Sequence, residues 1–135
     1  METAIWDQLV ALHGMVTHQL AKQMQRRHNI GLSEFQALCR LASADDGELR
    51  MQELAELIGL NQSSVSRLVA RLESSGLTRR DLCPKDRRGV YTVITDEGRA
   101  LHREALPTYQ QVLAEAMDEA AADARVSELA AKLRS

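Results

Sequence analysis

The stretch that decides the fold runs from residue 51 to residue 76 and reads MQELAELIGLNQSSVSRLVARLESSG. Its apolar residues recur every three or four positions, which predicts two amphipathic helices, one over 51–58 and one up to Ser74. Gly59 lies where the first helix would end in a left-handed conformation. Asn61 can cap the second helix by accepting from a backbone N–H two or three residues later. Two such helices, joined by a short turn that contains glycine, form a helix-turn-helix.

The second helix has one apolar side and one polar side. Val65, Leu68, Val69 and Leu72 mark the buried side. A helix of this size fits the major groove of DNA, where Gln and Arg make paired hydrogen bonds to base edges and Ser reaches a base or a phosphate. An ordinary solvated face is the alternative. The polar side consists of six candidate DNA contacts: Gln62, Ser63, Ser64, Ser66, Arg67 and Arg71.

Downstream of Gly76 the pattern changes to two short extended runs, 77–82 and 90–95, separated by CPKDRRG. This arrangement predicts a β-hairpin with a basic tip. Such a tip beside a polar helix offers a second contact, because arginine is attracted to the negative potential of a narrow minor groove. Asp86 can hold an arginine in position by a charge-assisted hydrogen bond. The candidate basic contacts at the tip are Lys85, Arg87 and Arg88.

Helices are also predicted on both sides of this central region. An apolar stripe from Ile5 to Met24 indicates a long first helix that ends at Asn29. Ser33 is expected to cap a second helix, and Thr95 to cap a further long helix after the hairpin. A last short helix follows around 126–133.

Composition and charge agree with a single domain of 135 residues. Apolar residues make up 44% of the chain but aromatic residues only 3%, which favours packed helices. We therefore expect a mostly α fold with a small β-hairpin wing. The net charge is −2, yet residues 61–103 carry nine basic and five acidic side chains, so the predicted DNA-contacting region is positive.

Several segments together resemble the MarR family of winged helix-turn-helix regulators. They are MQELA (51–55), VSRLVARLESSGL (65–77), DRRG (86–89) and ITDEG (94–98). The resemblance implies a homodimer, built from helices within 1–30 and 96–135, that presents two winged modules (33–95) to a pseudo-palindromic operator. It also places the family's wing arginine at Arg88, the acidic partner of that arginine at Asp86, and a further basic position at Arg80.

The resemblance implies a DNA-binding transcription regulator, a repressor that a small aromatic or anionic effector releases from duplex DNA. A winged-helix module that binds protein and not DNA is the alternative. The candidate effector contacts are Trp6, His13, Met15, Phe35, Arg40 and His102.

The sequence offers little support for an enzyme, a cofactor or a metal site. Its four histidines are scattered, and it has no Ser-His-Asp order, phosphate loop or His-Glu-x-x-His run. Zinc held by His28, Glu34 and His102 is a minor alternative, because Leu106 stands where a further ligand is expected. Cys39 is expected to be a buried thiol and Cys83 a loop residue, with a more acidic thiol as the alternative for Cys83. The acidic amino terminus resembles neither a signal peptide nor a membrane span, so we expect a cytoplasmic protein.

Overall fold

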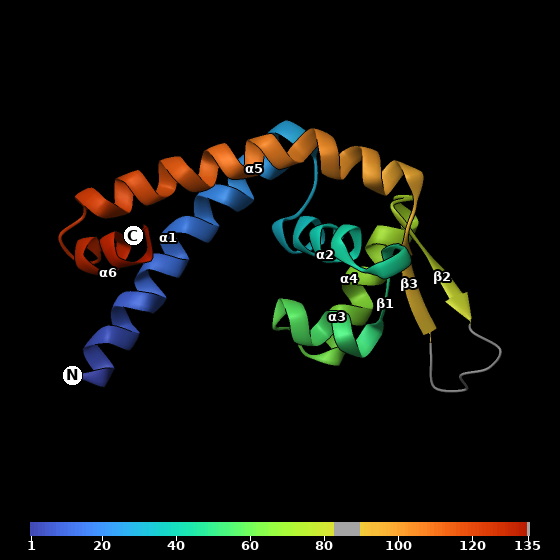
Figure 1. The fold of residues 1–135 in the computed structure, drawn as a ribbon, viewed down its shortest axis with the longest axis horizontal. Coiled ribbons are helices and arrows are strands. Elements are labelled where there is room, and N and C mark those ends of the chain that lie inside the picture. Colours follow the sequence, from blue (N-terminus) through green and yellow to red (C-terminus); the bar gives the residue numbers. More distant parts are fainter. Residues whose placement is uncertain (83–89, 135) are drawn as a thin grey trace. The chain divides into compact units, whose positions relative to one another are not determined.

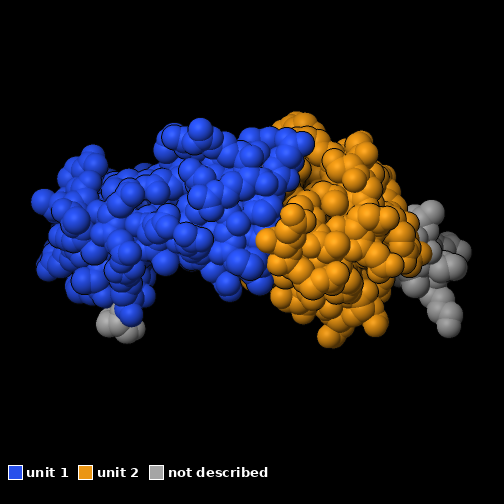
Figure 2. Space-filling model, turned by 90° about the horizontal axis from the view of Figure 1, so that it is seen from above, with its two compact units in different colours: residues 1–29, 105–135 blue, residues 30–104 orange. Residues whose placement is uncertain are grey.

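A computed structural model describes residues 1–82 and 90–134 and is mostly helical, with one small antiparallel sheet (Figure 1). The predicted fold class is confirmed. The chain divides into two compact units, one of residues 1–29 with 105–135 and one of residues 30–104, coloured separately in Figure 2. The elements in chain order are α1 (Glu2–His28), α2 (Leu32–Ser43), the short 3-10 helix η1 (Asp45–Gly47), β1 (Glu48–Arg50), α3 (Met51–Ile58), α4 (Gln62–Ser74), β2 (Thr78–Leu82), β3 (Val90–Ile94), α5 (Asp96–Ala122) and α6 (Ser127–Arg134).

The helix-turn-helix forms as predicted, from α3 and α4. Gly59 ends α3 with φ 71°, a left-handed conformation that glycine adopts without strain. The Asn61 side chain accepts a hydrogen bond of 2.9 Å from the backbone N–H of Ser64 at the start of α4. Val65, Leu68, Val69 and Leu72 are all at most 1% exposed. The apolar stripe therefore fixes which side of α4 remains available to a ligand.

The sheet has three strands in the order β1-β3-β2, one more than the predicted hairpin. β2 and β3 pair antiparallel from Thr78 opposite Ile94 to Leu82 opposite Val90. On the other edge of β3, β1 pairs Glu48 with Val93 and Arg50 with Tyr91. Because β1 leads directly into α3, the sheet connects the first helix of the helix-turn-helix to the wing.

Thr95 links the end of the sheet to α5 and to the end of α4. Its hydroxyl accepts from the backbone N–H of Gly98 at 3.0 Å, which confirms it as the cap of α5. The same hydroxyl donates to the carbonyl oxygen of Gly76 at 2.7 Å. The Thr95 backbone N–H donates to the carbonyl oxygen of Leu77 at 3.1 Å. At Gly98 a Cβ atom would collide with the Leu77 carbonyl oxygen, so the first turn of α5 lies directly against the backbone.

The expected cap of α2 is wrong. α2 begins at Leu32, with Gly31 as the cap residue in an extended conformation and no side-chain cap. The Gly31 carbonyl oxygen accepts from the N–H of Phe35 at 3.0 Å, which starts the helix two residues earlier than a Ser33 cap would. Ser33 therefore lies inside the first turn of α2. The end of α1 is as predicted, since Asn29 is left-handed with φ 52°.

The unit of residues 1–29 and 105–135 contains both a core and an exposed apolar surface. Leu12, Ala120, Val126 and Ala130 form the buried cluster, where α1 meets α5 and α6. Neither α1 nor any other helix among the described residues is long and apolar enough to cross a membrane. The large apolar side chains of this unit that remain exposed are Met1, Ile5, Trp6, Leu9, Val10 and Leu133.

Candidate nucleic-acid interface

The outer side of α4 exposes five of the six predicted contacts. They are Gln62, Ser63, Ser66, Arg67 and Arg71. They lie on the side of α4 opposite the buried stripe, so these side chains do not pack in the core. Ser64 is partly buried, and its backbone N–H is already bonded to the Asn61 cap. Within 1–82 and 90–134, Arg67 has no carboxylate partner, which leaves its guanidinium available to a ligand.

Two other predicted arginines are engaged in ion pairs on the protein surface. Arg71 of α4 lies 3.2 Å from the carboxylate of Glu34 on α2. Arg80 of β2 lies 2.6 Å from the carboxylate of Glu73 on α4. The two pairs connect α4 to α2 on one side and to the wing on the other. Both arginines are more than half exposed, so they can contribute positive potential to this surface while they position α4.

The strands of the wing present further basic side chains next to α4. Arg79 and Arg80 on β2 are both exposed. The predicted contacts of the wing tip, together with Cys83, lie outside the described residues; these contacts are Lys85, Asp86, Arg87 and Arg88.

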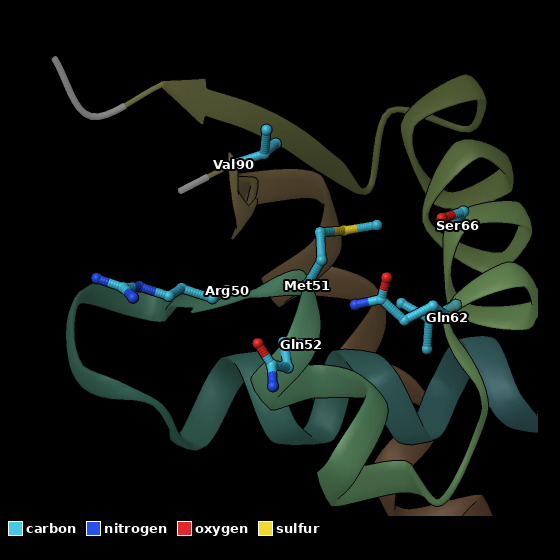
Figure 3. A pocket seen from close by; sticks show the side chains of 7 residues that line it. Arg50, Met51, Gln52, Gln62, Ser66 and Val90 are labelled. Carbon is cyan, nitrogen blue, oxygen red and sulfur yellow. The ribbon is translucent and has the colours of Figure 1, made fainter. Parts of the chain in front are cut away.

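A groove of about 390 Å³ lies between α4 and the start of α3 (Figure 3). Gln62 points from α4 towards Met51 at the start of α3, and Val90 lies on the neighbouring strand β3. The Thr92 hydroxyl donates to the sulfur of Met51 at 3.2 Å, which holds the Met51 side chain in place. The groove is lined by Arg50, Met51, Gln52, Gln62, Val65, Ser66 and Val90. We call it the α3–α4 groove.

Sequence reasoning missed Arg50 and Gln52 as candidate contacts. Their position at the start of the first helix of the helix-turn-helix was the available signal, because this helix crosses the DNA backbone in proteins of this architecture. Arg50 donates from Nε to the hydroxyl of Tyr91 at 3.0 Å, and its guanidinium carbon lies 5.4 Å from the centre of the Tyr91 ring.

The predicted effector contacts are divided between the two units. Trp6 and His13 are exposed on α1, while Met15 packs against the core of the same unit. In the other unit Arg40 is exposed, whereas Phe35 is fully buried. Their joint role in binding an effector stays a prediction.

The rings of Phe35 and His102 are stacked. Their ring centroids are 5.8 Å apart with an angle of 21° between the planes. Burial, assisted by the positive charges of Arg103 and Arg99, lowers the pKa of His102 below its ordinary value. The neutral imidazole is therefore the favoured partner of Phe35 in the folded protein.

The residues weighed for zinc and for redox chemistry have other surroundings. His28 shares a hydrogen bond of 2.8 Å with the Thr108 hydroxyl, and Glu34 is paired with Arg71. In the described parts of the chain, no three His, Cys, Asp or Glu side chains gather as a metal site would require. Cys39 is partly buried, and this burial raises the pKa of its thiol, so the unreactive protonated form is favoured.

Comparison with known proteins adds an independent observation. A model described as the MarR family matches residues 30–90, which cover the helix-turn-helix and β2 and end at the first residue of β3. The transcriptional repressor MprA of Escherichia coli (strain K12) is 27% identical over 112 residues. That alignment covers 78% of this chain and 64% of MprA, so the chain spans slightly less than two thirds of that relative.

Solved structures of other regulators also resemble the chain. Sco3205, a MarR family transcriptional regulator from Streptomyces coelicolor solved in complex with DNA, matches with a TM-score of 0.81 and 29% identity over 98% of this chain and 83% of that one. CouR from Rhodococcus jostii RHA1, solved with bound p-coumaroyl-CoA, matches with a TM-score of 0.69 and 28% identity over 77% and 71%. In the helix-turn-helix and the wing strands the chain is therefore similar to transcriptional regulators of the MarR family.

Proposed function

We propose that this protein is a sequence-specific DNA-binding transcription regulator that acts as a repressor in the cytoplasm. The observation that carries the proposal is the polar side of α4, where Gln62, Ser66 and Arg67 are exposed opposite a fully buried stripe. Such side chains can form hydrogen bonds with base edges in the major groove. The similar regulator Sco3205 was solved with DNA, and the similar MprA is named a repressor, which supports both parts of the proposal.

The direct test measures binding of the protein to duplexes selected from random sequence, over a series of salt concentrations. Neutralisation of phosphates releases counterions, so the logarithm of the affinity should fall linearly with the logarithm of the salt concentration. A module that binds only protein would show no such dependence. Absence of duplex binding at low salt would refute the proposal.

Arg67→Ala is expected to weaken binding to the selected operator by roughly 1–3 kcal/mol, with a much smaller loss on a scrambled duplex. The reason is that Arg67 projects from the recognition helix, where paired hydrogen bonds distinguish one base from another. Titration of both duplexes with both proteins checks this. Arg26→Ala, at an exposed arginine in the last turn of α1, is the matched control and should leave both affinities unchanged. Equal losses on the two duplexes would assign Arg67 to the DNA backbone.

The protein is further proposed to be a homodimer that binds a pseudo-palindromic operator with half-sites about one helical turn apart. The supporting observation is the apolar surface of α1, where Ile5, Trp6 and Val10 are each more than half exposed. Leu133 of α6 is also more than half exposed. Light scattering should give the mass of two chains at micromolar concentration, and a monomer at that concentration would contradict the proposal.

A small aromatic or anionic effector is proposed to release the operator. The similar CouR was solved with an aromatic acyl thioester of coenzyme A, which supports an effector of this chemistry. An effector that favours a conformation unable to bind DNA should weaken operator binding by about 1–3 kcal/mol, and the operator should weaken effector binding equally. A panel of phenolic acids and their thioesters, titrated against the operator complex, tests this. Unchanged affinity and unchanged melting temperature across the panel would count against an effector.

A further inference from the structure

The C-terminal half of α4 is held by two ion pairs, each built on a glutamate. Glu34 of α2 accepts from Nε of Arg71 at 3.2 Å, and Glu73 of α4 accepts from Nε of Arg80, on β2, at 2.6 Å. The glutamate side chains are 19% and 26% exposed, whereas both arginine side chains are more than half exposed. Each carboxylate therefore lies against the protein, where salt screens it less than it screens an ion pair in open solvent.

Local structure places the two glutamates for these pairs. Glu73 lies in the last turn of α4, where the helix dipole disfavours a negative charge, so its ion pair with Arg80 offsets an unfavourable position. A Cβ at Gly31 would lie 3.2 Å from Oε1 of Glu34, the oxygen that accepts from Arg71. The absence of a side chain at Gly31 therefore leaves room for the Glu34 carboxylate to reach Arg71.

We infer that Glu34 and Glu73 are positioning residues that fix the orientation of α4 on the operator, a role that rests on the proposed function. One ion pair ties α4 to α2 and the other ties it to β2. Hydrogen bonds to base edges need α4 in one orientation, whereas contacts with phosphates carry no sequence information. Arg71 and Arg80, which the sequence suggested as direct DNA contacts, act on base recognition through the two carboxylates.

Charge alone would give these glutamates the opposite effect on DNA binding. A carboxylate beside a surface that binds phosphates repels DNA, so its removal should tighten binding to every duplex. Removal of a positioning residue should instead weaken binding to the operator and spare a scrambled duplex, because only the operator depends on the orientation of α4. The sign of the change on the operator therefore separates the two roles.

The first test uses Glu34→Gln and Glu73→Gln in the full chain, two changes that keep the size of the side chain and remove its charge. Each variant should bind the operator about three- to five-fold more weakly, the upper range for an ion pair at a protein surface, and should bind the scrambled duplex at least as tightly as the wild type. Glu56→Gln, at an exposed glutamate of α3 that takes part in none of the ion pairs found between described residues, is the matched control. It should retain the preference for the operator, and melting curves check that each protein is folded.

Glu73 and Arg80 should also behave as one unit. The loss on the operator should be about equal in Glu73→Gln, in Arg80→Gln and in the variant with both changes, because removal of either partner already breaks the pair. Arg80→Gln should keep the salt slope of the wild type. Arg79→Gln removes the same charge from the preceding residue of β2, whose side chain lies on the other face of the strand, and should leave the operator-to-scrambled ratio of affinities unchanged.

A direct contact between Arg80 and a phosphate would give another result. Arg80→Gln would then weaken both duplexes alike and reduce the salt slope by about one unit, while Glu73→Gln would bind as well as the wild type or better. That result, or wild-type affinity for the operator in both Glu34→Gln and Glu73→Gln, would overturn the positioning role while the proposed function stands. If the wild type binds no duplex, the proposed function itself fails.

Discussion

Replacing Phe35 with alanine is expected to lower the free energy of unfolding by about 3–5 kcal/mol, the usual effect of removing a large aromatic side chain from a core. Phe35 is 0% exposed on α2, and its ring lies against that of His102. Urea denaturation of the two proteins measures the difference. The matched control is Leu57→Ala on α3, which removes a side chain that is 46% exposed and should change stability far less.

The same experiment separates two roles of Phe35. A large loss of stability identifies it as a core residue, whatever its effect on an effector. If Phe35→Ala were as stable as the Leu57→Ala control, the side chain would not be needed for packing. Contact with an effector, as predicted from the sequence, would then be the better explanation for a buried phenylalanine at this position.

The second large effect is expected at Gly98. In an exposed helix interior, alanine is more favourable than glycine by about 1 kcal/mol. Here the sign should reverse, because the added Cβ would collide with the backbone carbonyl oxygen of Leu77 and approach the Ile94 side chain at 2.8 Å. Backbone cannot move aside as a side chain can, so we expect Gly98→Ala to lower the free energy of unfolding by about 3 kcal/mol, the upper part of the range for overpacking.

Gly59→Ala provides the control for this prediction. Nothing lies within 4 Å of a Cβ built at Gly59, so the substitution meets only the strain of its left-handed backbone, about 1–2 kcal/mol. Thermal and urea unfolding of both variants should therefore rank Gly98→Ala as the less stable. A Gly98→Ala protein with a melting temperature above that of the wild type would show that α5 can shift away from the sheet without loss.

The helices, and their ends apart from the start of α2, depend on local patterns, which is why they could be predicted. The buried stripe of α4, the left-handed Gly59 and the caps Asn61 and Thr95 each depend on a few neighbouring residues. β1 was missed because its three residues, Glu48–Arg50, are too few to show alternation and exist as a strand only by pairing with β3. Its partner residues are more than 40 positions away in the chain, a separation that local patterns cannot reveal.

The candidate interface was predictable in part for the same reason. Helical spacing alone placed Gln62, Ser66 and Arg67 on the polar side of α4. It could not show that Arg71 is paired with Glu34, because that carboxylate comes from another helix, 37 residues away. Nor could it show that Arg50 and Gln52 share a groove with Gln62, since this depends on how α3 and α4 pack across the turn.

The exposed apolar surface of α1 also has a spectroscopic consequence. Trp6 is the chain's only tryptophan, and it is 61% exposed among Ile5, Leu9 and Val10. Indole emission moves to shorter wavelength when the ring leaves water, so contact between two such surfaces would change the colour of the protein's own fluorescence. Because no second tryptophan contributes a background, the wavelength of maximum emission would report the fraction of paired chains at each dilution without any added label.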